Sequence, residues 1–89
     1  RLTVQWNNLA VPLTVTEFWM VHALTKFTGH VKSRQVLMQE SKIFVDGSTI
    51  TSHIKRIRKK FMLVDEEFDC IETVYGMGYR WNLESVLRE

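Results

Sequence analysis

The chain has 89 residues, of which 45% are hydrophobic and only four are Gly and one Pro, so we expect one small folded domain over 1–89 rather than a disordered chain. The formal net charge is only +2, which excludes a uniformly basic protein. The single cysteine, Cys70, excludes an internal disulfide and fits the reducing cytoplasm, and no apolar run approaches the roughly 18 residues of a membrane span. Because the first residue is Arg1 and not Met, we also expect the chain to be part of a longer protein.

The N-terminal third predicts a β-hairpin followed by a helix. Apolar and polar residues alternate over 2–6 and again over 9–13, and Asn7-Asn8 between them is typical of a tight turn. Thr14 and Glu17 have the spacing of a capping box, in which the side chain of each residue bonds the backbone N–H of the other. The helix that begins there is apolar around much of its circumference, so we expect it at the centre of the core.

The rest of the chain predicts two more helices and a second hairpin. Ser33 can cap a short helix, a loop follows at 41–46, and a basic helix then runs to about Met62. Strands are expected at 71–74 and 79–81, joined by a glycine-containing turn. The order hairpin, helix, helix, basic helix, hairpin predicts an α+β winged helix-turn-helix, whose final hairpin is the wing.

The basic helix combines an apolar stripe with a cationic side. Five of the twelve Lys and Arg residues of the chain lie within positions 55–60, and no Asp or Glu occurs between Ser48 and Leu63. Four apolar residues recur at helical spacing: Ile50, Ile54, Ile57 and Phe61. At about 100° per residue, four polar residues project from the other side: Ser52, Lys55, Arg56 and Lys59. Such a helix suits the major groove of DNA, whereas an ordinary solvated face would mix charges of both signs.

Four segments, taken together and in order, resemble the effector domain of OmpR/PhoB-type response regulators. They are LTVTEF at 13–18, KSR at 32–34, TITSHIKRIRK at 49–59 and YGMGYR at 75–80. Among these regulators the chain looks most similar to ChvI-like members. The resemblance implies sequence-selective binding of double-stranded DNA without a cofactor, an N-terminal receiver domain outside this chain, and an upstream sensor kinase. It also implies tandem homodimers on direct-repeat DNA and contact with RNA polymerase.

The resemblance also implies roles for individual residues. Base contacts fall on Thr51, Ser52 and Arg56, and backbone contacts on Ser48, Thr49, His53, Lys55 and Arg58. The helical projection adds Lys59, and Arg34, at the start of the second helix, can hold a phosphate with the backbone amides there. The wing tip is expected at Tyr75, Gly76 and Met77.

The chain departs from many relatives of this type at three places. Thr51 stands where Asp is frequent, so readout of cytosine by a carboxylate acceptor is not expected at that position. Tyr75 replaces an Arg that reaches into the minor groove. The loop 41–46 is shorter than in most relatives, so we expect the interaction with polymerase to differ or to be absent.

Some residues have two interpretations. His53 can contact a phosphate or make a structural bond to the backbone, and the acidic run 65–69 can be a solvated loop or a contact between subunits. Gly76 and Gly78 are typical of a turn rather than of a nucleotide loop, and neither a catalytic group nor a metal-ligand spacing is evident. We therefore expect a DNA-binding protein and not an enzyme; the alternative is a winged-helix module that binds proteins instead of DNA.

Overall fold

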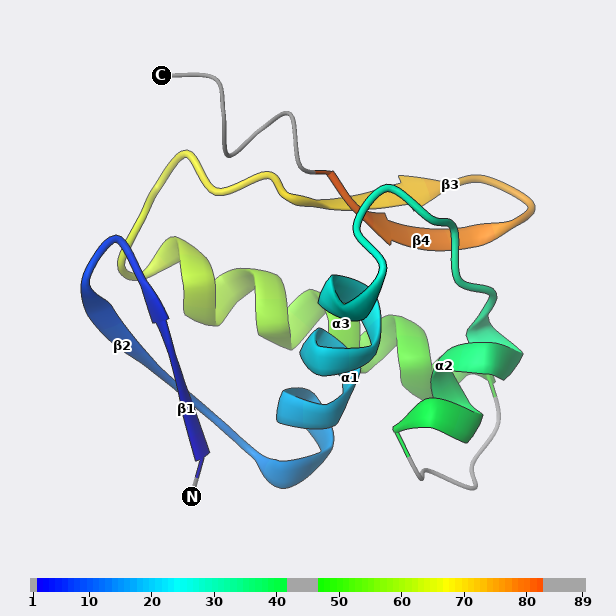
Figure 1. Ribbon diagram of the computed structural model, residues 1–89, viewed down its shortest axis with the longest axis horizontal. Helices are drawn as coiled ribbons and strands as arrows, with labels where there is room; N and C mark the ends of the chain where they lie inside the picture. Colours follow the sequence, from blue (N-terminus) through cyan, green and yellow to red (C-terminus); the bar gives the residue numbers. More distant parts are fainter. Residues whose placement is uncertain (1, 42–46, 83–89) are drawn as a thin grey trace.

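The computed structural model describes residues 2–41 and 47–82, without the side chains of Leu2 and of residues 47–49. In chain order, three helices stand between two antiparallel hairpins (Figure 1). The elements are β1 (Leu2–Trp6), β2 (Leu9–Leu13), α1 (Val15–Lys26), α2 (Arg34–Glu40), α3 (Gly47–Met62), β3 (Ile71–Val74) and β4 (Gly78–Trp81). This is the predicted order, and the prediction of a winged helix-turn-helix is confirmed. In the described part of the chain, no helix is both long and apolar enough to cross a membrane.

The first hairpin turns at the two asparagines, as predicted. Asn7 and Asn8 both have positive φ, 53° and 64°, which is the backbone that a two-residue turn between twisted strands requires. Asn tolerates this conformation better than most residues because its short side chain bonds locally. The inward side of β2 carries Val11 and Leu13, both fully buried, so the hairpin closes one side of the core.

Side-chain caps begin α1 and α2. The Glu17 N–H donates to Thr14 Oγ1 at 3.1 Å, and the Thr14 N–H donates to Glu17 Oε1 at 2.9 Å, so the capping box is confirmed. The Val36 N–H donates to Ser33 Oγ at 3.1 Å, as predicted for the second helix. Ser41 ends α2, and the rest of the predicted loop 41–46 lies outside the described residues.

The apolar stripe of α3 lies against the rest of the core. Ile50, Ile54, Ile57 and Phe61 are each at most 1% exposed, which confirms the predicted inner side of this helix. At its C-terminal end lies an aromatic cluster with centroid distances of 4.5 to 5.9 Å. Its members are Trp6, Phe61, Phe68 and Trp81. Trp6 Nε1 also donates to Asp65 Oδ2 at 2.8 Å, so the first acid of the run 65–69 belongs to the structure of the core and is not merely solvated.

The wing, which is the hairpin formed by β3 and β4, is hydrogen-bonded to the segment before α2. The Lys32 N–H donates to the Tyr79 carbonyl at 2.6 Å, and the Tyr79 N–H donates to the Lys32 carbonyl at 2.9 Å. Gly78, with φ +141°, packs so closely against this segment that an added Cβ would overlap the Lys32 carbonyl oxygen. The wing is therefore held in a fixed position relative to α2.

Candidate nucleic-acid interface

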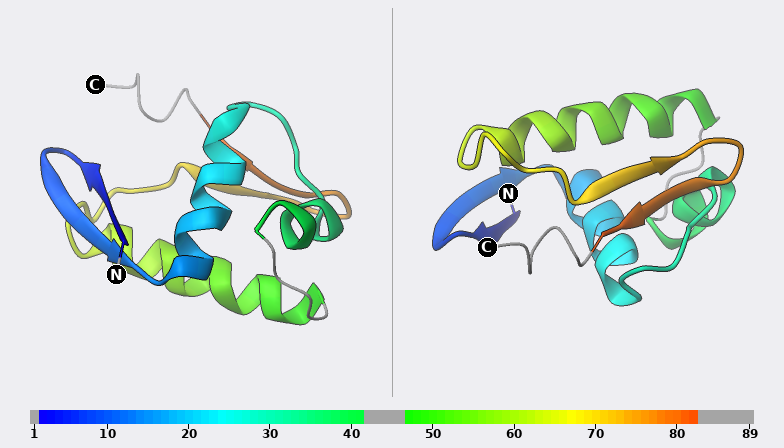
Figure 2. Two further views of the ribbon diagram at one scale, coloured as in Figure 1. Left: turned by 60° about the horizontal axis from the view of Figure 1, so that its bottom comes forward. Right: turned by 90° about the horizontal axis from the view of Figure 1, so that it is seen from above.

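Helix α3 lies along one edge of the molecule. In Figure 1 it runs behind α1, and in the view from above it forms the upper edge, with no other element outside it (right panel of Figure 2). The wing tip lies at the same end of the molecule as the N-terminal half of α3 (Figure 2). A helix and a hairpin tip are thus presented together, as they are when such domains approach neighbouring grooves of a duplex.

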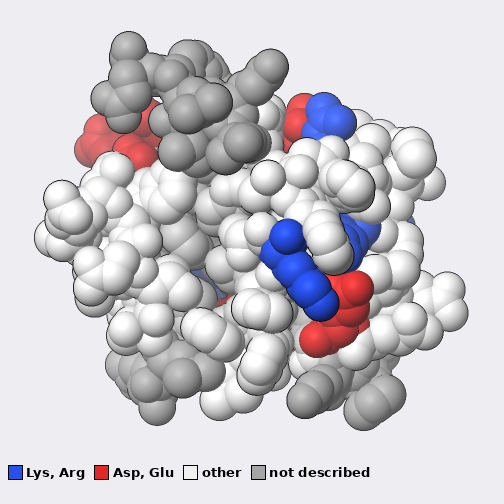
Figure 3. Space-filling model, viewed as in Figure 1, with Lys and Arg blue, Asp and Glu red and all other residues white. Residues whose placement is uncertain are grey.

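The outer face of α3 is polar and cationic. Ser52, Lys55, Arg56 and Lys59 are exposed, as the helical projection predicted, and Thr51 is exposed beside them. The face of the molecule turned to the viewer in Figure 1 differs, because its few Lys and Arg side chains lie next to Asp or Glu (Figure 3). The cations do not gather on that face, whereas on α3 they occupy successive turns without an acid among them.

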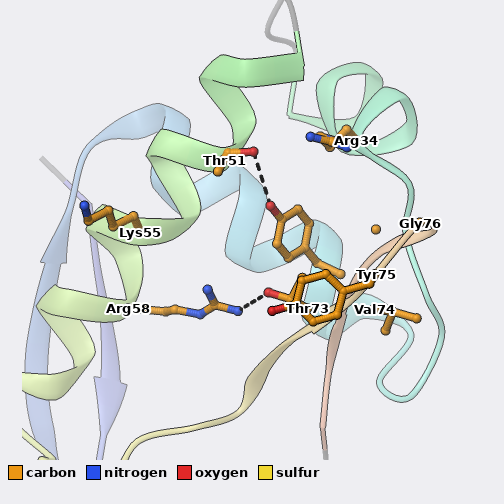
Figure 4. Close-up of a pocket in the computed structure, with 10 residues that line it drawn as sticks. Arg34, Thr51, Lys55, Arg58, Thr73, Val74, Tyr75 and Gly76 are labelled. Atoms are coloured by element: carbon orange, nitrogen blue, oxygen red, sulfur yellow. Dashed lines mark hydrogen bonds between the residues drawn. The ribbon is translucent and has the colours of Figure 1, made fainter.

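A groove of about 420 Å³ separates α3 from the wing. Three cations line it, Arg34 from α2 and Lys55 and Arg58 from α3, together with residues of the wing tip (Figure 4). The Tyr79 hydroxyl donates to Thr51 Oγ1 at 3.4 Å across the groove. Positive side chains from two helices around one groove can neutralise a backbone phosphate placed there.

Arg58 has a structural role that the sequence did not reveal. Its Nε and Nη2 donate to the Ile71 carbonyl at 3.2 and 2.7 Å, and Nη2 also donates to Thr73 Oγ1 at 2.9 Å (Figure 4). The guanidinium therefore fastens α3 to β3. A contact of Arg58 with a phosphate stays a prediction, and the described hydrogen bonds leave Nη1 as the nitrogen for it.

A buried carboxylate lies beneath the cationic face. Glu17, only 1% exposed, accepts a hydrogen bond from Lys60 Nζ at 2.6 Å and lies 3.9 Å from Arg56 Nε. Burial acts to raise the pKa of Glu17, but the hydrogen bonds from Lys60 and Thr14 outweigh it, so its pKa lies below the ordinary value. Glu17 therefore stays ionised at neutral pH and is a fixed negative charge at the base of α3.

His53 is a half-buried residue of α3 that interacts with both Glu17 and Arg56. Its Nδ1 is 3.0 Å from Arg56 Nη2, and because a guanidinium only donates, Nδ1 accepts this bond. Burial and the neighbouring Arg56 cation lower the pKa of His53, and together they outweigh Glu17, which raises it. The lowered pKa favours the neutral ring. This described bond is to a side chain and not to the backbone. Both predicted roles of His53, the bond to the backbone and the phosphate contact, therefore stay predictions.

Comparison with known proteins decides the family. The family described as "Transcriptional regulatory protein, C terminal" matches residues 8–81. The chain belongs to this family, the DNA-binding effector domains of OmpR/PhoB-type response regulators. The closer likeness to ChvI-like members stays a prediction.

Relatives and solved structures of this family cover nearly all of the chain. It is 35% identical over 88 residues to the transcriptional regulatory protein BaeR of Escherichia coli O6:H1, covering 96% of this chain and 37% of BaeR. It is 32% identical over 83 residues to SrrA of Staphylococcus aureus, covering 89% of this chain and 34% of SrrA. The chain thus spans about a third of the length of these curated relatives.

Two of the similar structures contain DNA. The DNA-binding domain of the response regulator AdeR, in complex with an intercistronic region, aligns with a TM-score of 0.79 and 27% identity, covering 90% of this chain and 84% of that one. The Klebsiella pneumoniae RstA domain, in complex with the RstA box, aligns with a TM-score of 0.74 and 28% identity, covering 90% and 82%.

The remaining predicted residues of this OmpR/PhoB-type domain lie at the ends of the interface. Arg34 is exposed at the first position of α2, and Tyr75, Gly76 and Met77 are exposed at the wing tip, where Tyr75 is 91% exposed. Ser48 and Thr49 fall in the first turn of α3, and their side chains lie outside the described residues.

Proposed function

We propose that this domain binds double-stranded DNA in a sequence-selective way, as the output domain of a two-component response regulator that controls transcription. The observation that carries the proposal is the exposed, acid-free cationic face of α3, bordered by a groove with three cations. In this arrangement α3 enters the major groove, and the wing tip approaches the neighbouring minor groove. The complexes that AdeR and RstA form with DNA support it.

Within this interface the side chains divide into base readers and backbone clamps. Arg56, with Thr51 and Ser52, faces the base edges, and a guanidinium can bond guanine O6 and N7 together. The proposed clamps bind phosphates and carry no sequence information. They are Arg34, Ser48, Thr49, His53, Lys55, Arg58 and Lys59.

Arg56→Ala and Lys55→Ala should therefore behave differently. Arg56→Ala should lower the discrimination between a selected duplex and random DNA by about 1–3 kcal/mol, the value of one bidentate base contact. Lys55→Ala should weaken binding to both duplexes by the same factor. Selection of bound duplexes from a random pool supplies the specific site, and fluorescence anisotropy measures both affinities at one salt concentration. Equal changes in discrimination for the two variants would contradict this division.

Binding should also weaken steeply as salt rises, since each neutralised phosphate releases counterions. Substitution of Lys55, Arg56 and Lys59 by Gln should reduce the log–log salt slope by about 2, roughly one for each of the two proposed phosphate clamps, Lys55 and Lys59. Lys26→Gln, at the exposed end of α1, is the matched control and should leave the slope unchanged. A slope near zero in the unaltered protein would favour the alternative, a winged-helix module that binds proteins.

The wider setting follows from the same proposal. A receiver domain, phosphorylated by a sensor kinase, would control this cytoplasmic output domain, which is a binding module and not an enzyme. Tandem homodimers on direct repeats would place the exposed acids Glu66 and Glu67 where a neighbouring domain can present cations. RNA polymerase would be the remaining partner.

A further inference from the structure

Glu17 has an environment that a helix cap does not require. A capping box needs a carboxylate that reaches back to the N-cap N–H, and Glu17 Oε1 does so at 2.9 Å. The second oxygen, Oε2, is directed to Arg56, whose Nε lies 3.9 Å away. The carboxylate is 98% buried as a side chain, since only 2% of it is exposed, so it cannot itself touch DNA.

Arg56 is restrained from two sides. The negative charge of Glu17 attracts its Nε edge, and His53 accepts a bond from its Nη2 at 3.0 Å. These contacts occupy one edge of the guanidinium and leave the Nη1 hydrogens, with the second hydrogen of Nη2, for a base. An unrestrained arginine loses much rotamer freedom when it binds, so restraint before binding favours the contact.

Lys60, and not Arg56, makes the short ion pair with Glu17. It takes the shorter bond to Glu17, at 2.6 Å, and so satisfies Oε1. Arg56 is then held at the longer distance of 3.9 Å and its side chain remains 53% exposed. A single carboxylate thus binds one cation of α3 firmly and aligns a second one that stays accessible.

We propose that Glu17 is a positioning residue for base recognition: from the core, together with His53, it fixes the guanidinium of Arg56 in the orientation that reads DNA. The inference rests on the proposed function of Arg56. It assigns a part in sequence selectivity to a residue of α1 that makes no contact with the duplex. His53 serves this purpose only as the neutral ring, because protonation removes the acceptor at Nδ1.

The test is a double-mutant cycle on base discrimination. Glu17→Gln retains the size and a cap acceptor but removes the charge, and should lower the discrimination between selected and random duplexes about fivefold, in the range of partly exposed ion pairs. In the Arg56→Ala background the same substitution should change discrimination by less than about twofold, because the group to be positioned is gone. Circular dichroism checks that each variant is folded at the temperature used.

Each outcome separates the two ideas. The proposed function of Arg56 fails if the unaltered domain does not discriminate between selected and random duplexes. It also fails if Arg56→Ala discriminates between them as well as the unaltered domain. If Arg56→Ala loses discrimination but Glu17→Gln keeps it, only the role of Glu17 is overturned. A loss that is equally large in the Arg56→Ala background would mean a general effect on α1 and α3, which also overturns it.

A second measurement needs no variant at Glu17, in case Glu17→Gln does not fold. The Nε–H signal of Arg56, followed by NMR in the unaltered domain, should shift as His53 is protonated, since protonation puts a cation among Arg56, Lys60 and Glu17. The Nε–H of Arg58, bonded to Ile71, is the internal control and should move little. An Arg56 signal that does not respond while His53 titrates would contradict the restraint.

Discussion

Gly78→Ala is expected to destabilise the domain by about 3 kcal/mol or more, the sum of a strained backbone and a close overlap. Gly78 has φ +141°, which residues with a side chain rarely adopt. A Cβ added at this position would meet backbone atoms, which cannot rotate away as a side chain can. The ideal Cβ would overlap the Lys32 carbonyl oxygen and come within 2.8 Å of Ser33 Cα. Relief requires breaking the paired hydrogen bonds between Lys32 and Tyr79, so the wing should detach from α2. Urea unfolding measures the loss.

Gly76→Ala is the matched control for this variant. Gly76 also has positive φ, +80°, but nothing lies within 4 Å of the position that a Cβ would take. It should therefore lose only about 1 kcal/mol, the cost of the left-handed backbone alone. Similar losses at the two glycines would show that the close approach to Lys32 contributes little to stability.

Lys60→Met should be the most destabilising change on the polar side of α3. It leaves the Glu17 carboxylate in the core without its partner at 2.6 Å. Removal of one member of a buried pair costs about 3–5 kcal/mol, but Lys60 is 32% exposed, so we expect about 2–3 kcal/mol. Lys59→Met, one residue away on the exposed side, should change stability by less than about 0.5 kcal/mol.

The pH dependence provides an independent check on the same pair. The pKa of Glu17 is lowered in the folded state, so its contribution to stability is present above the pKa of the unfolded chain and is lost as pH falls. Lys60→Met removes the part of this contribution that Lys60 supplies, while the bonds with Thr14 remain. The stability difference between the unaltered domain and Lys60→Met should therefore shrink below a pH of about 4.5, the ordinary pKa of Glu. Glu17→Gln with Lys60→Met should recover much of the loss. A difference that stays constant with pH would rule out the buried pair as its source.

The sequence predicted the features that depend on local patterns. The stripe from Ile50 to Phe61, the caps at Thr14 and Ser33, and the turn at Asn7-Asn8 each involve residues a few positions apart. Their spacing alone fixes which face is buried or which donor is satisfied. The exposed face of α3 followed from the same periodicity.

The sequence did not reveal the contacts between residues that are far apart in the chain. Glu17 was recognised only as a cap, although its carboxylate also binds Lys60, 43 positions later. Arg58 was assigned only to DNA, but it also bonds Ile71. Asp65 was expected in a solvated loop or a subunit contact, but it bonds Trp6, 59 positions away. Such pairs depend on how the elements pack, and a charged residue on a helix gives no local sign of which partner it meets. An acid at the cap and a run of cations without acids were the only indication of Glu17 as the counter-charge.

The attachment of the wing has a consequence for the DNA itself. Arg58 bonds β3 to α3, and Lys32 bonds β4 to the segment before α2. Helix α3 and the wing tip are therefore held at a set separation. In the proposed binding mode, in which α3 and the wing tip enter neighbouring grooves, the duplex would adjust its groove width and curvature to the protein, rather than the reverse. In that binding mode, base steps that bend easily would be preferred between the two contacts, and selectivity would extend to nucleotides that no side chain touches.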